Sequence, residues 1–307
     1  MTKQLVLMDH DGGVDDYLAT MLLLTMDHIE LLGVVVTPAD CYVQPAVSAT
    51  RKIIDLMGFP HIPVAESTAR GINPFPTLYR RDSFIVDHLP ILNQSETITT
   101  PLVAETGQDF MIKVLREASD AVTLMVTGPL TTVAVALDKA PDIEAKIHKI
   151  VWMGGALNVG GNVEKSLEAG QDGSAEWNVY WDAISAARVW QTQIEIIMCP
   201  LDLTNNVPVI SELVYKMGRQ RHYPISDLAG QCYALVIPQD YYFWDVLATA
   251  YLGHPEFYQL REWETEIITT GISQGCTKVV PGGRKIYAMD KVDKDAFYAY
   301  ILQQWAR

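Results

Sequence analysis

Residues 5–16 read Leu-Val-Leu-Met-Asp-His-Asp-Gly-Gly-Val-Asp-Asp. The apolar run at 5–8 predicts a buried strand, and the chain then changes at once to acids around a pair of glycines. Apolar residues recur with helical spacing over 15–26. A strand, a glycine turn and a helix in this order begin a βαβ unit, which indicates a parallel sheet. We therefore expect the acids at 9–16 to lie at the carboxyl end of the first strand.

The same alternation continues through two thirds of the chain. Runs that are apolar throughout predict strands buried on both faces, at 5–8, 29–36, 62–65, 122–126, 150–153 and 194–198. Helical periodicity occupies 15–26, 45–57, 108–117, 132–139 and 182–191, most of 207–252, and a closing segment at 292–305. This pattern predicts a single α/β domain over residues 1–307, with an open, mainly parallel sheet flanked by helices and a helical subregion.

Composition and charge restrict the partners of the chain. Its 307 residues are 49% hydrophobic and 20% charged, with a formal net charge of -14. A surface this acidic repels phosphate backbones and anionic lipids, so nucleic-acid polymers and membranes are poor partners. The four cysteines form no CxxC pair, the first apolar run is too short for a signal sequence, and no run is long enough to span a bilayer. We expect a cytoplasmic protein that binds a small neutral molecule or a metal cation.

Polar residues follow several of the predicted strands. Asp40 follows the second strand, Thr127 follows 122–126, and four polar residues come after 150–153, namely Asn158, Asn162, Glu176 and Asn178. The carboxyl ends of parallel strands meet at one edge of a sheet, which is where ligands bind in such folds. These side chains and the acids of residues 9–16 are therefore expected to converge.

The first acidic cluster predicts a metal site. Asp9, Asp11, Asp15 and Asp16 place four carboxylates within eight residues. They repel one another unless a cation compensates, and calcium prefers oxygen ligands of this kind. The structural alternative is a helix N-terminus with acids in its first turn, which requires only one or two of them. His10 points away from its acidic neighbours if the strand continues, so we assign it a structural role.

Two segments are expected to form mobile lids over this edge of the sheet. Residues 70–93 read as a long loop without secondary structure, and 226–243 form the second segment. Both carry aromatic side chains, and long loops of this type usually serve a binding site.

With these stretches the chain resembles the nucleoside hydrolase family. The family's signature of Asp-x-Asp, a glycine turn and an Asp-Asp pair corresponds to residues 9–16, although this chain has Gly12 where proline is more common. Further matching stretches follow in the family's order: Thr127-Gly128-Pro129-Leu130, Met153-Gly154-Gly155, Gly161-Asn162-Val163, Ala175-Glu176-Trp177-Asn178 and Trp244-Asp245. The closest likeness is to the purine-preferring branch. Other branches carry a histidine where this chain has Trp244, which removes the simplest acid for the leaving base.

The resemblance implies hydrolysis of the N-glycosidic bond of a purine ribonucleoside. It implies a Ca2+ ion held by Asp11, Asp16, the backbone carbonyl of Thr127, and Asp245. The ion would bind the ribose 2′- and 3′-hydroxyls and a water, and Asp11 would act as general base. It also implies a small ribonucleoside as the partner and a homodimer or homotetramer as the assembly.

The same resemblance assigns the substrate contacts. Ribose hydroxyls would be bound by Asp15, Asn162, Glu176 and Asn178. Met153 would pack near the sugar, and Trp177 belongs to the same motif. Trp244 and Tyr79 would hold the purine between their faces, although Tyr79 occupies a position where the purine branch usually has tryptophan. Asp40 would orient the edge of the base.

Three alternatives remain open from the sequence. The first is a hydrolase of broader specificity that accepts both purine and pyrimidine ribonucleosides. The second is a magnesium-dependent phosphohydrolase with an Asp-x-Asp motif, although such an enzyme needs Lys or Arg near its phosphate and the first cluster has none nearby. The third is a non-catalytic protein of the same fold that binds a nucleoside. The full set of acids argues against this third alternative.

Overall fold

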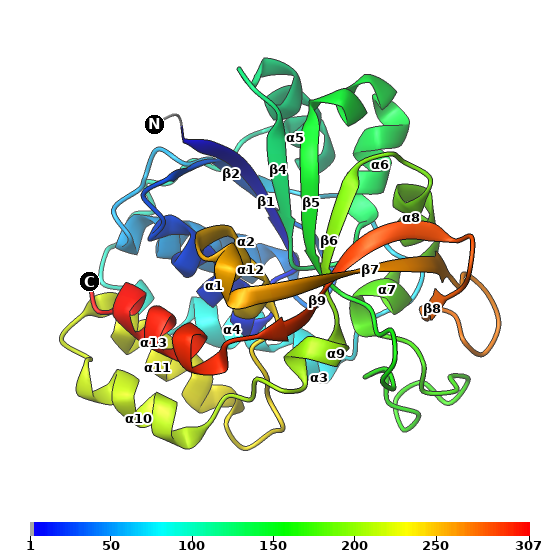
Figure 1. Ribbon diagram of the computed structural model, residues 1–307. Helices are drawn as coiled ribbons and strands as arrows, with labels where there is room; N and C mark the ends of the chain where they lie inside the picture. Colours follow the sequence, from blue (N-terminus) through cyan, green and yellow to red (C-terminus); the bar gives the residue numbers. More distant parts are fainter. Residues whose placement is uncertain (1–2) are drawn as a thin grey trace.

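One sheet forms the centre of the fold, in the computed structural model that describes residues 3–307 (Figure 1). Within these residues nine strands pair in the order β3-β2-β1-β4-β5-β6-β9-β7-β8. Neighbours from β3 to β9 in this order are parallel, and β7 is antiparallel to β9 and β8. The strands are β1 (Gln4–His10), β2 (Ile29–Val36), β3 (Val64–Glu66), β4 (Val122–Val126), β5 (Ile147–Met153), β6 (Glu195–Cys199), β7 (Tyr258–Ile267), β8 (Thr277–Val279) and β9 (Arg284–Val292).

Helices cover both faces of the sheet (Figure 1). One layer contains α1 (Val14–Leu24), α2 (Val43–Leu56), α11 (Pro224–Val236), α12 (Asp245–Gly253) and α13 (Lys294–Trp305), and the other contains α5 (Gly107–Glu117), α6 (Thr131–Lys139) and α8 (Ala183–Trp190). Successive side chains of β1 enter alternate layers: Val6 and Met8 pack with the first, Leu5 and Leu7 with the second. Burial on both faces explains why this strand is apolar throughout.

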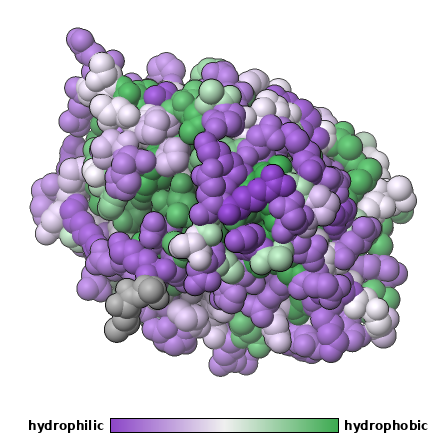
Figure 2. All heavy atoms as spheres, turned by 90° about the horizontal axis from the view of Figure 1, so that it is seen from above, coloured by the Kyte–Doolittle hydropathy of each residue, from purple (hydrophilic) through white to green (hydrophobic). Residues whose placement is uncertain are grey.

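Short elements complete the chain. They are α3 (Thr77–Arg80), α4 (Asp82–Asp87), α7 (Trp177–Trp181), α9 (Leu201–Thr204), α10 (Ser211–Arg219) and three 3-10 turns at Pro90–Leu92, Pro141–Lys146 and Pro255–Phe257. Hydrophilic side chains cover most of the face seen from above the view of Figure 1 (Figure 2). None of the helices over residues 3–307 combines the length and apolar composition that a bilayer crossing requires.

The predicted parallel sheet is confirmed. Strands 29–36 and 122–126 have the predicted bounds, the other four lie within a few residues of theirs, and the helices between them are present. The hairpin of β7 and β9 was not predicted. Most side chains of Tyr258–Ile267 are at least partly exposed, and charged residues interrupt its apolar positions. A strand with this composition lacks the continuous apolar run that identified the others.

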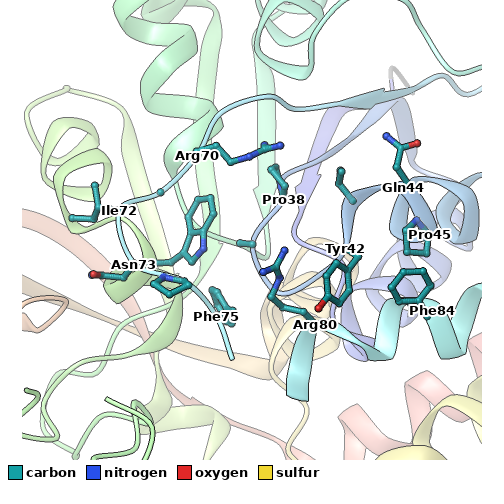
Figure 3. Close-up of a pocket in the computed structure, with 15 residues that line it drawn as sticks. Pro38, Tyr42, Gln44, Pro45, Arg70, Ile72, Asn73, Phe75, Arg80 and Phe84 are labelled. Atoms are coloured by element: carbon teal, nitrogen blue, oxygen red, sulfur yellow. The ribbon is translucent and has the colours of Figure 1, made fainter. Parts of the chain in front are cut away.

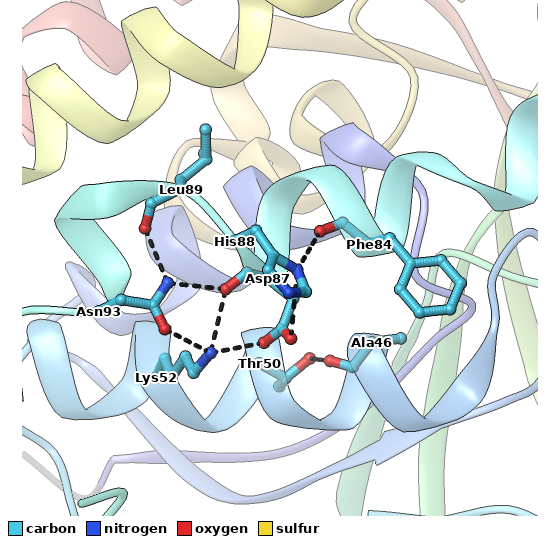
Figure 4. Close-up of polar contacts among 8 residues, drawn as sticks. All are labelled: Ala46, Thr50, Lys52, Phe84, Asp87, His88, Leu89 and Asn93. Carbon is cyan, nitrogen blue, oxygen red and sulfur yellow. Dashed lines mark hydrogen bonds and ion pairs between the residues drawn. The ribbon is translucent and has the colours of Figure 1, made fainter. Parts of the chain in front are cut away.

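The prediction that residues 70–93 lack secondary structure was wrong. They form α3, α4 and a 3-10 turn at Pro90–Leu92. Lys52 of α2 holds this segment: its ammonium group donates to Oδ1 of Asp87 at 2.8 Å, to the carbonyl of Asp87 at 3.0 Å and to Oδ1 of Asn93 at 2.8 Å (Figure 4). Likewise, most of the predicted second lid, 226–243, belongs to α11. The mobility of both segments stays a prediction.

Candidate active site

A cavity of about 370 Å³ opens where the strand order reverses. The chain passes from β1 outward to β2 and β3 on one side, and β4 lies on the other side of β1. Loops after β1 and β4 diverge at such a point, which leaves a crevice at the carboxyl ends of the strands. All thirteen site residues expected from the sequence line this one cavity: Asp11, Asp15, Asp16, Asp40, Tyr79, Thr127, Met153, Asn162, Glu176, Trp177, Asn178, Trp244 and Asp245. Their individual roles stay predictions.

A tight turn after β1 brings the first acids into the cavity. Gly12 has a φ of +83°, and a Cβ at this position would lie 2.7 Å from Cβ of Cys41. Glycine alone therefore fits, because it accepts positive φ and has no side chain to collide. The amide of Gly13 donates to Oδ2 of Asp16 at 2.7 Å, which caps α1 and fixes that carboxylate. His10, as expected, faces away and pairs with Thr50 at 3.0 Å in the core.

The loop after β4 approaches the same acids. A Cβ on Gly128 would lie 2.6 Å from Cβ of Asp11, so this glycine permits the close contact. The hydroxyl of Thr127 donates to Oδ1 of Asp16 at 2.5 Å. Its backbone carbonyl accepts from Nδ2 of Asn178 at 2.9 Å, and the same amide nitrogen lies 3.2 Å from the carbonyl of Met153. Asn178 thus joins the ends of β4 and β5 at the cavity wall.

The loop between β5 and α7 is held by its own polar residues. Oε2 of Glu176 accepts from the amide of Gly155 at 2.9 Å and from that of Val179 at 3.2 Å. Oδ1 of Asn162 accepts from the amide of Trp177 at 3.0 Å. These bonds fix the loop against the end of β5. The Nδ2 group of Asn162 is left to donate into the cavity that it lines.

The segment that leads into α12 forms the remaining acidic wall of the cavity. Oδ1 of Asp15 accepts from the hydroxyl of Tyr241 at 2.8 Å, and its Oδ2 accepts from the backbone amide of Asp245 at 3.2 Å. Asp245 is the first residue of α12, and its carboxylate lines the cavity beside that of Asp15. The amino end of one helix therefore brings a distant acid to the acids after β1.

Burial and mutual repulsion govern the ionisation of these acids. Burial raises the pKa of Asp15 to about 6, with a further contribution from the charge of Asp16. Burial followed by neighbouring carboxylates raises the pKa of Asp11, Asp40 and Asp245 well above the usual range. A group of buried carboxyl groups with raised pKa values is typical of a functional site. In proteins such a group is stabilised either by protons or by a bound cation.

Aromatic side chains form the other walls of the cavity. Trp244 lies against Tyr241 with ring centroids 4.6 Å apart, and its Nε1 is buried without a hydrogen-bond partner. Tyr79 meets the edge of Trp177 at 6.2 Å, and its hydroxyl donates to Glu164 at 2.6 Å. Both residues expected to hold the base thus line the cavity that also contains the acids.

Several lining residues were not among the site residues predicted from the sequence, although Phe75, Tyr241 and Tyr242 were expected as aromatic residues of the two lids. They are Phe75, Asp82, Glu164, Asn205, Gln239, Asp240, Tyr241 and Tyr242. The aromatic cluster before Trp244 was a signal for the last two, because it directly precedes a candidate metal ligand. Two residues expected at this edge do not line the cavity. Asp9 lies inside β1, where it accepts from Thr37 at 2.7 Å, and Asn158 bonds to Asp202.

A second cavity of about 590 Å³ shares Phe75 with the first. Figure 3 shows the side chains that line this second cavity. Its walls are mostly apolar, and Arg70 and Arg80 are its charged residues. The guanidinium of Arg80 stacks 4.6 Å from the ring centre of Tyr42, and its Nε donates to the carbonyl of Cys41 at 3.1 Å. No carboxylate lines this space among the described residues, so we place the active site in the acidic cavity.

Comparison with known proteins shows the family to which the chain belongs. The family described as inosine-uridine preferring nucleoside hydrolase matches residues 6–299. The chain belongs to this family. A nucleoside hydrolase structure from Bacillus anthracis, titled as inosine-uridine preferring, is 44% identical, covers 99% of both chains and superposes with a TM-score of 0.95.

Relatives within the nucleoside hydrolases differ in their named substrates. A pyrimidine-specific ribonucleoside hydrolase from Klebsiella pneumoniae is 27% identical over 98% of both chains. A purine-preferring ribonucleoside hydrolase from Gardnerella vaginalis shares the fold, with a TM-score of 0.81, 22% identity and coverage of 99% of this chain and 98% of that one. Family membership therefore shows that this chain is a ribonucleoside hydrolase. Because its relatives prefer different bases, the base preference has to be inferred from the residues that line its own cavity.

Proposed function

We propose that this nucleoside hydrolase cleaves purine ribonucleosides to ribose and free base, with Ca2+ as cofactor and Asp11 as general base. The observation that carries the proposal is the composition of one cavity. Buried carboxylates from the turn after β1, from α1 and from α12 line it, and aromatic rings from α3, α7 and the start of α12 form its walls. A ribose diol suits the carboxylates, and a flat base suits the aromatic rings.

The chemistry of the donor groups fits a calcium ion. Asp11, Asp16, Asp245 and the carbonyl of Thr127 would hold it, and all four offer hard oxygen atoms. No three Asp, Glu, His or Cys side chains of residues 3–307 converge closely enough to form a ready metal centre by themselves. The fit therefore rests on the mutual repulsion of the buried carboxylates, which a divalent cation would relieve. When bound, such an ion would acidify water and grip the ribose hydroxyls.

The residues of the chain have separate tasks in the proposed reaction. Asp11 accepts a proton from water as the water oxygen bonds to C1′. Meanwhile the C1′–N bond breaks, and its electron pair goes to the base, which takes up a proton. Asp15, Asn162, Glu176 and Asn178 bind the ribose hydroxyls, and the surrounding carboxylates stabilise positive charge at the sugar. Trp244 and Tyr79 stack on the base, Trp177 and Met153 pack beside the nucleoside, and Asp40 orients the base edge.

Broader specificity is the second candidate, and the name of the Klebsiella pneumoniae relative favours including pyrimidines. A magnesium-dependent phosphohydrolase is disfavoured because no Lys or Arg lines the acidic cavity among the described residues. A non-catalytic binder is disfavoured because the complete set of acids is present around it.

A nucleoside panel tests the proposal. Inosine, adenosine, guanosine, uridine, cytidine and a phosphomonoester are assayed with the metal-free protein and after addition of Ca2+ or Mg2+. We expect release of free base from the purine nucleosides in the presence of Ca2+, with at least about tenfold lower kcat/KM for uridine, or about 1.4 kcal/mol. Equal kcat/KM for uridine supports broad specificity. Full activity in the chelated protein contradicts the role of calcium.

We further infer a homodimer or homotetramer. Segment 72–85 exposes four large apolar side chains, Ile72, Leu78, Phe84 and Ile85, whose exposed fractions range from 38% to 51%. Exposed apolar side chains of this kind are commonly covered by another subunit. Sedimentation of the intact protein gives the mass, and a monomer at all concentrations contradicts the inference.

A further inference from the structure

The acidic cavity contains more carboxyl groups than the proposed calcium site uses. Asp82, Glu164 and Asp240 line it, and so does Asp40, whose backbone amide donates to Oδ2 of Asp11 at 3.3 Å. They come from four separate segments, which follow β2, begin α4, follow β5 and precede α12. No Lys, Arg or His lines the cavity among the described residues. A low-dielectric space with acids on several sides attracts a positively charged ligand.

Basic side chains of the protein neutralise the charge of these acids only in part. Oδ1 of Asp40 is buried and has no hydrogen-bond partner. Asp82 has Arg81 as its ion-pair partner, at 3.9 Å, and 60% of the Arg81 side chain is exposed. Glu164 accepts a hydrogen bond from neutral Tyr79. Arg80 approaches Asp40 from the neighbouring cavity, where its guanidinium is engaged with Tyr42 and Cys41. A cationic group in the cavity would therefore meet carboxyl groups whose charge Arg80 and Arg81 compensate only in part.

The aromatic walls suit the same ligand. Trp244 packs against Tyr241, and Phe75 lies 5.2 Å from Trp177. The faces of such rings attract cations, and they attract flat cationic rings by stacking as well. The combination of aromatic walls and carboxylates is the arrangement that binds quaternary nitrogen in other proteins.

The proposed reaction also favours a base that carries a positive charge. A neutral base must gain a proton as the C1′–N bond breaks, and only carboxyl and tyrosine hydroxyl groups could supply it, because no His, Lys or Cys lines the cavity among the described residues. A base with a quaternary ring nitrogen needs no such proton, because the electron pair of the broken bond returns to that ring and neutralises it. Water then supplies the oxygen for C1′, one proton passes to Asp11, and the products are ribose and a neutral base.

We propose that this cavity prefers ribonucleosides whose base carries a permanent positive charge, such as N7-alkylated purine ribosides and pyridinium ribosides, over neutral bases of the same shape. The proposal rests on the proposed nucleoside hydrolysis and names a substrate class for it. The acids that line the cavity provide the attraction, and a cationic base leaves without needing a proton donor.

The test compares adenosine with N7-methyladenosine, which has no acidic ring N–H and therefore differs from adenosine by one methyl group and one positive charge. For the intact protein loaded with Ca2+, we expect a KM for N7-methyladenosine at least about fivefold lower than for adenosine. Methylation also weakens the C1′–N bond chemically, so the decisive readout is how carboxylate variants change the ratio of the two kcat/KM values. Asp82→Asn and Glu164→Gln should each lower this ratio at least about threefold. Asp240→Asn removes an exposed charge and provides a variant whose folding is not at risk.

Asp120→Asn is the matched control. It removes one exposed carboxylate just before β4, at the opposite end of the sheet from the cavity, and should leave the ratio unchanged. An equal or higher KM for N7-methyladenosine, or an unchanged ratio in all three cavity variants, overturns the inference while adenosine turnover still supports the proposed function. Turnover of neither nucleoside by the parent protein overturns the proposed function itself.

Discussion

The hydroxyl of Tyr241 donates a 2.8 Å hydrogen bond to Oδ1 of Asp15, which lies 226 residues earlier in the chain. Oδ2 of the same carboxylate accepts from the backbone amide of Asp245. Both oxygens of Asp15 are therefore oriented by the segment that begins α12. An acid held in this way presents its remaining lone pairs in a fixed direction, as binding of a ribose hydroxyl requires.

Removal of this bond should weaken substrate binding. We predict that Tyr241→Phe raises KM for inosine about tenfold or more, because a hydrogen bond to a carboxylate contributes about 1.5–3 kcal/mol. Steady-state kinetics with inosine measure the effect. Tyr242→Phe is the control, because Tyr242 also lines the cavity and its hydroxyl makes no hydrogen bond with any side chain among residues 3–307. Similar KM values for the two variants would contradict the proposal that Tyr241 aids binding by orienting Asp15.

Asp11 and Asp9 provide a matched pair for the proposed general base. We predict that Asp11→Ala lowers kcat at least about 1000-fold, because it removes the proton acceptor and a proposed metal ligand together. Asp9→Asn should retain most of the activity. Asp9 lies in β1 outside the cavity, and burial raises its pKa to about 8, so it is mostly neutral at pH 7 and asparagine resembles it. Near-normal turnover by Asp11→Ala, checked for folding by circular dichroism, would contradict its role.

Trp244 should affect purines more than pyrimidines. Trp244→Ala removes the larger stacking surface and about 0.5–1.5 kcal/mol beyond burial, and a purine overlaps it more than a pyrimidine does. We predict that kcat/KM falls at least about fivefold more for inosine than for uridine. Competition between the two nucleosides in one reaction gives this ratio directly. An equal loss for both would assign Trp244 to packing rather than to base recognition.

Calcium should stabilise the protein in the absence of substrate. A ligand that binds only the folded state adds about 2.7 kcal/mol at one hundred times its Kd, which raises Tm by several degrees in a chain of this size. We predict such a shift for the parent protein and for Asp9→Asn, and its loss in Asp245→Asn. Differential scanning calorimetry with and without Ca2+ is the measurement. The same shift in Asp245→Asn would exclude that carboxylate from the metal site.

The sequence was informative where strands are buried on both faces. The apolar runs of β1, β2 and β4 located the parallel sheet, and the acids directly after β1 located the part of the cavity proposed to bind ribose. The position of a residue just beyond a strand is fixed by the sheet, so Asp11 and Thr127 were predictable neighbours. The β7–β9 hairpin gave no such signal, because charged side chains occupy much of its surface.

The part of the cavity proposed to bind the base was less predictable for the same physical reason. Asp82, Glu164 and Asp240 lie in short helices and loops, and the order of strands does not determine where these segments fold. Tyr79 was placed only through the family resemblance. Its approach to Glu164 depends on α3 and α4, whose position depends in turn on the contacts of Lys52 with Asp87 and Asn93. A contact between side chains 85 residues apart is not encoded in local periodicity.

The amide of Asp245 reaches back to a carboxylate 230 residues before it. During synthesis on the ribosome, the segment that carries Asp11, Asp15 and Asp16 emerges first, and Asp245 emerges only after most of the chain has been made. Until then the proposed calcium site lacks one of its ligands. A protein truncated before α12 should therefore show neither calcium affinity nor turnover, and the finished polypeptide would acquire both in a single late event.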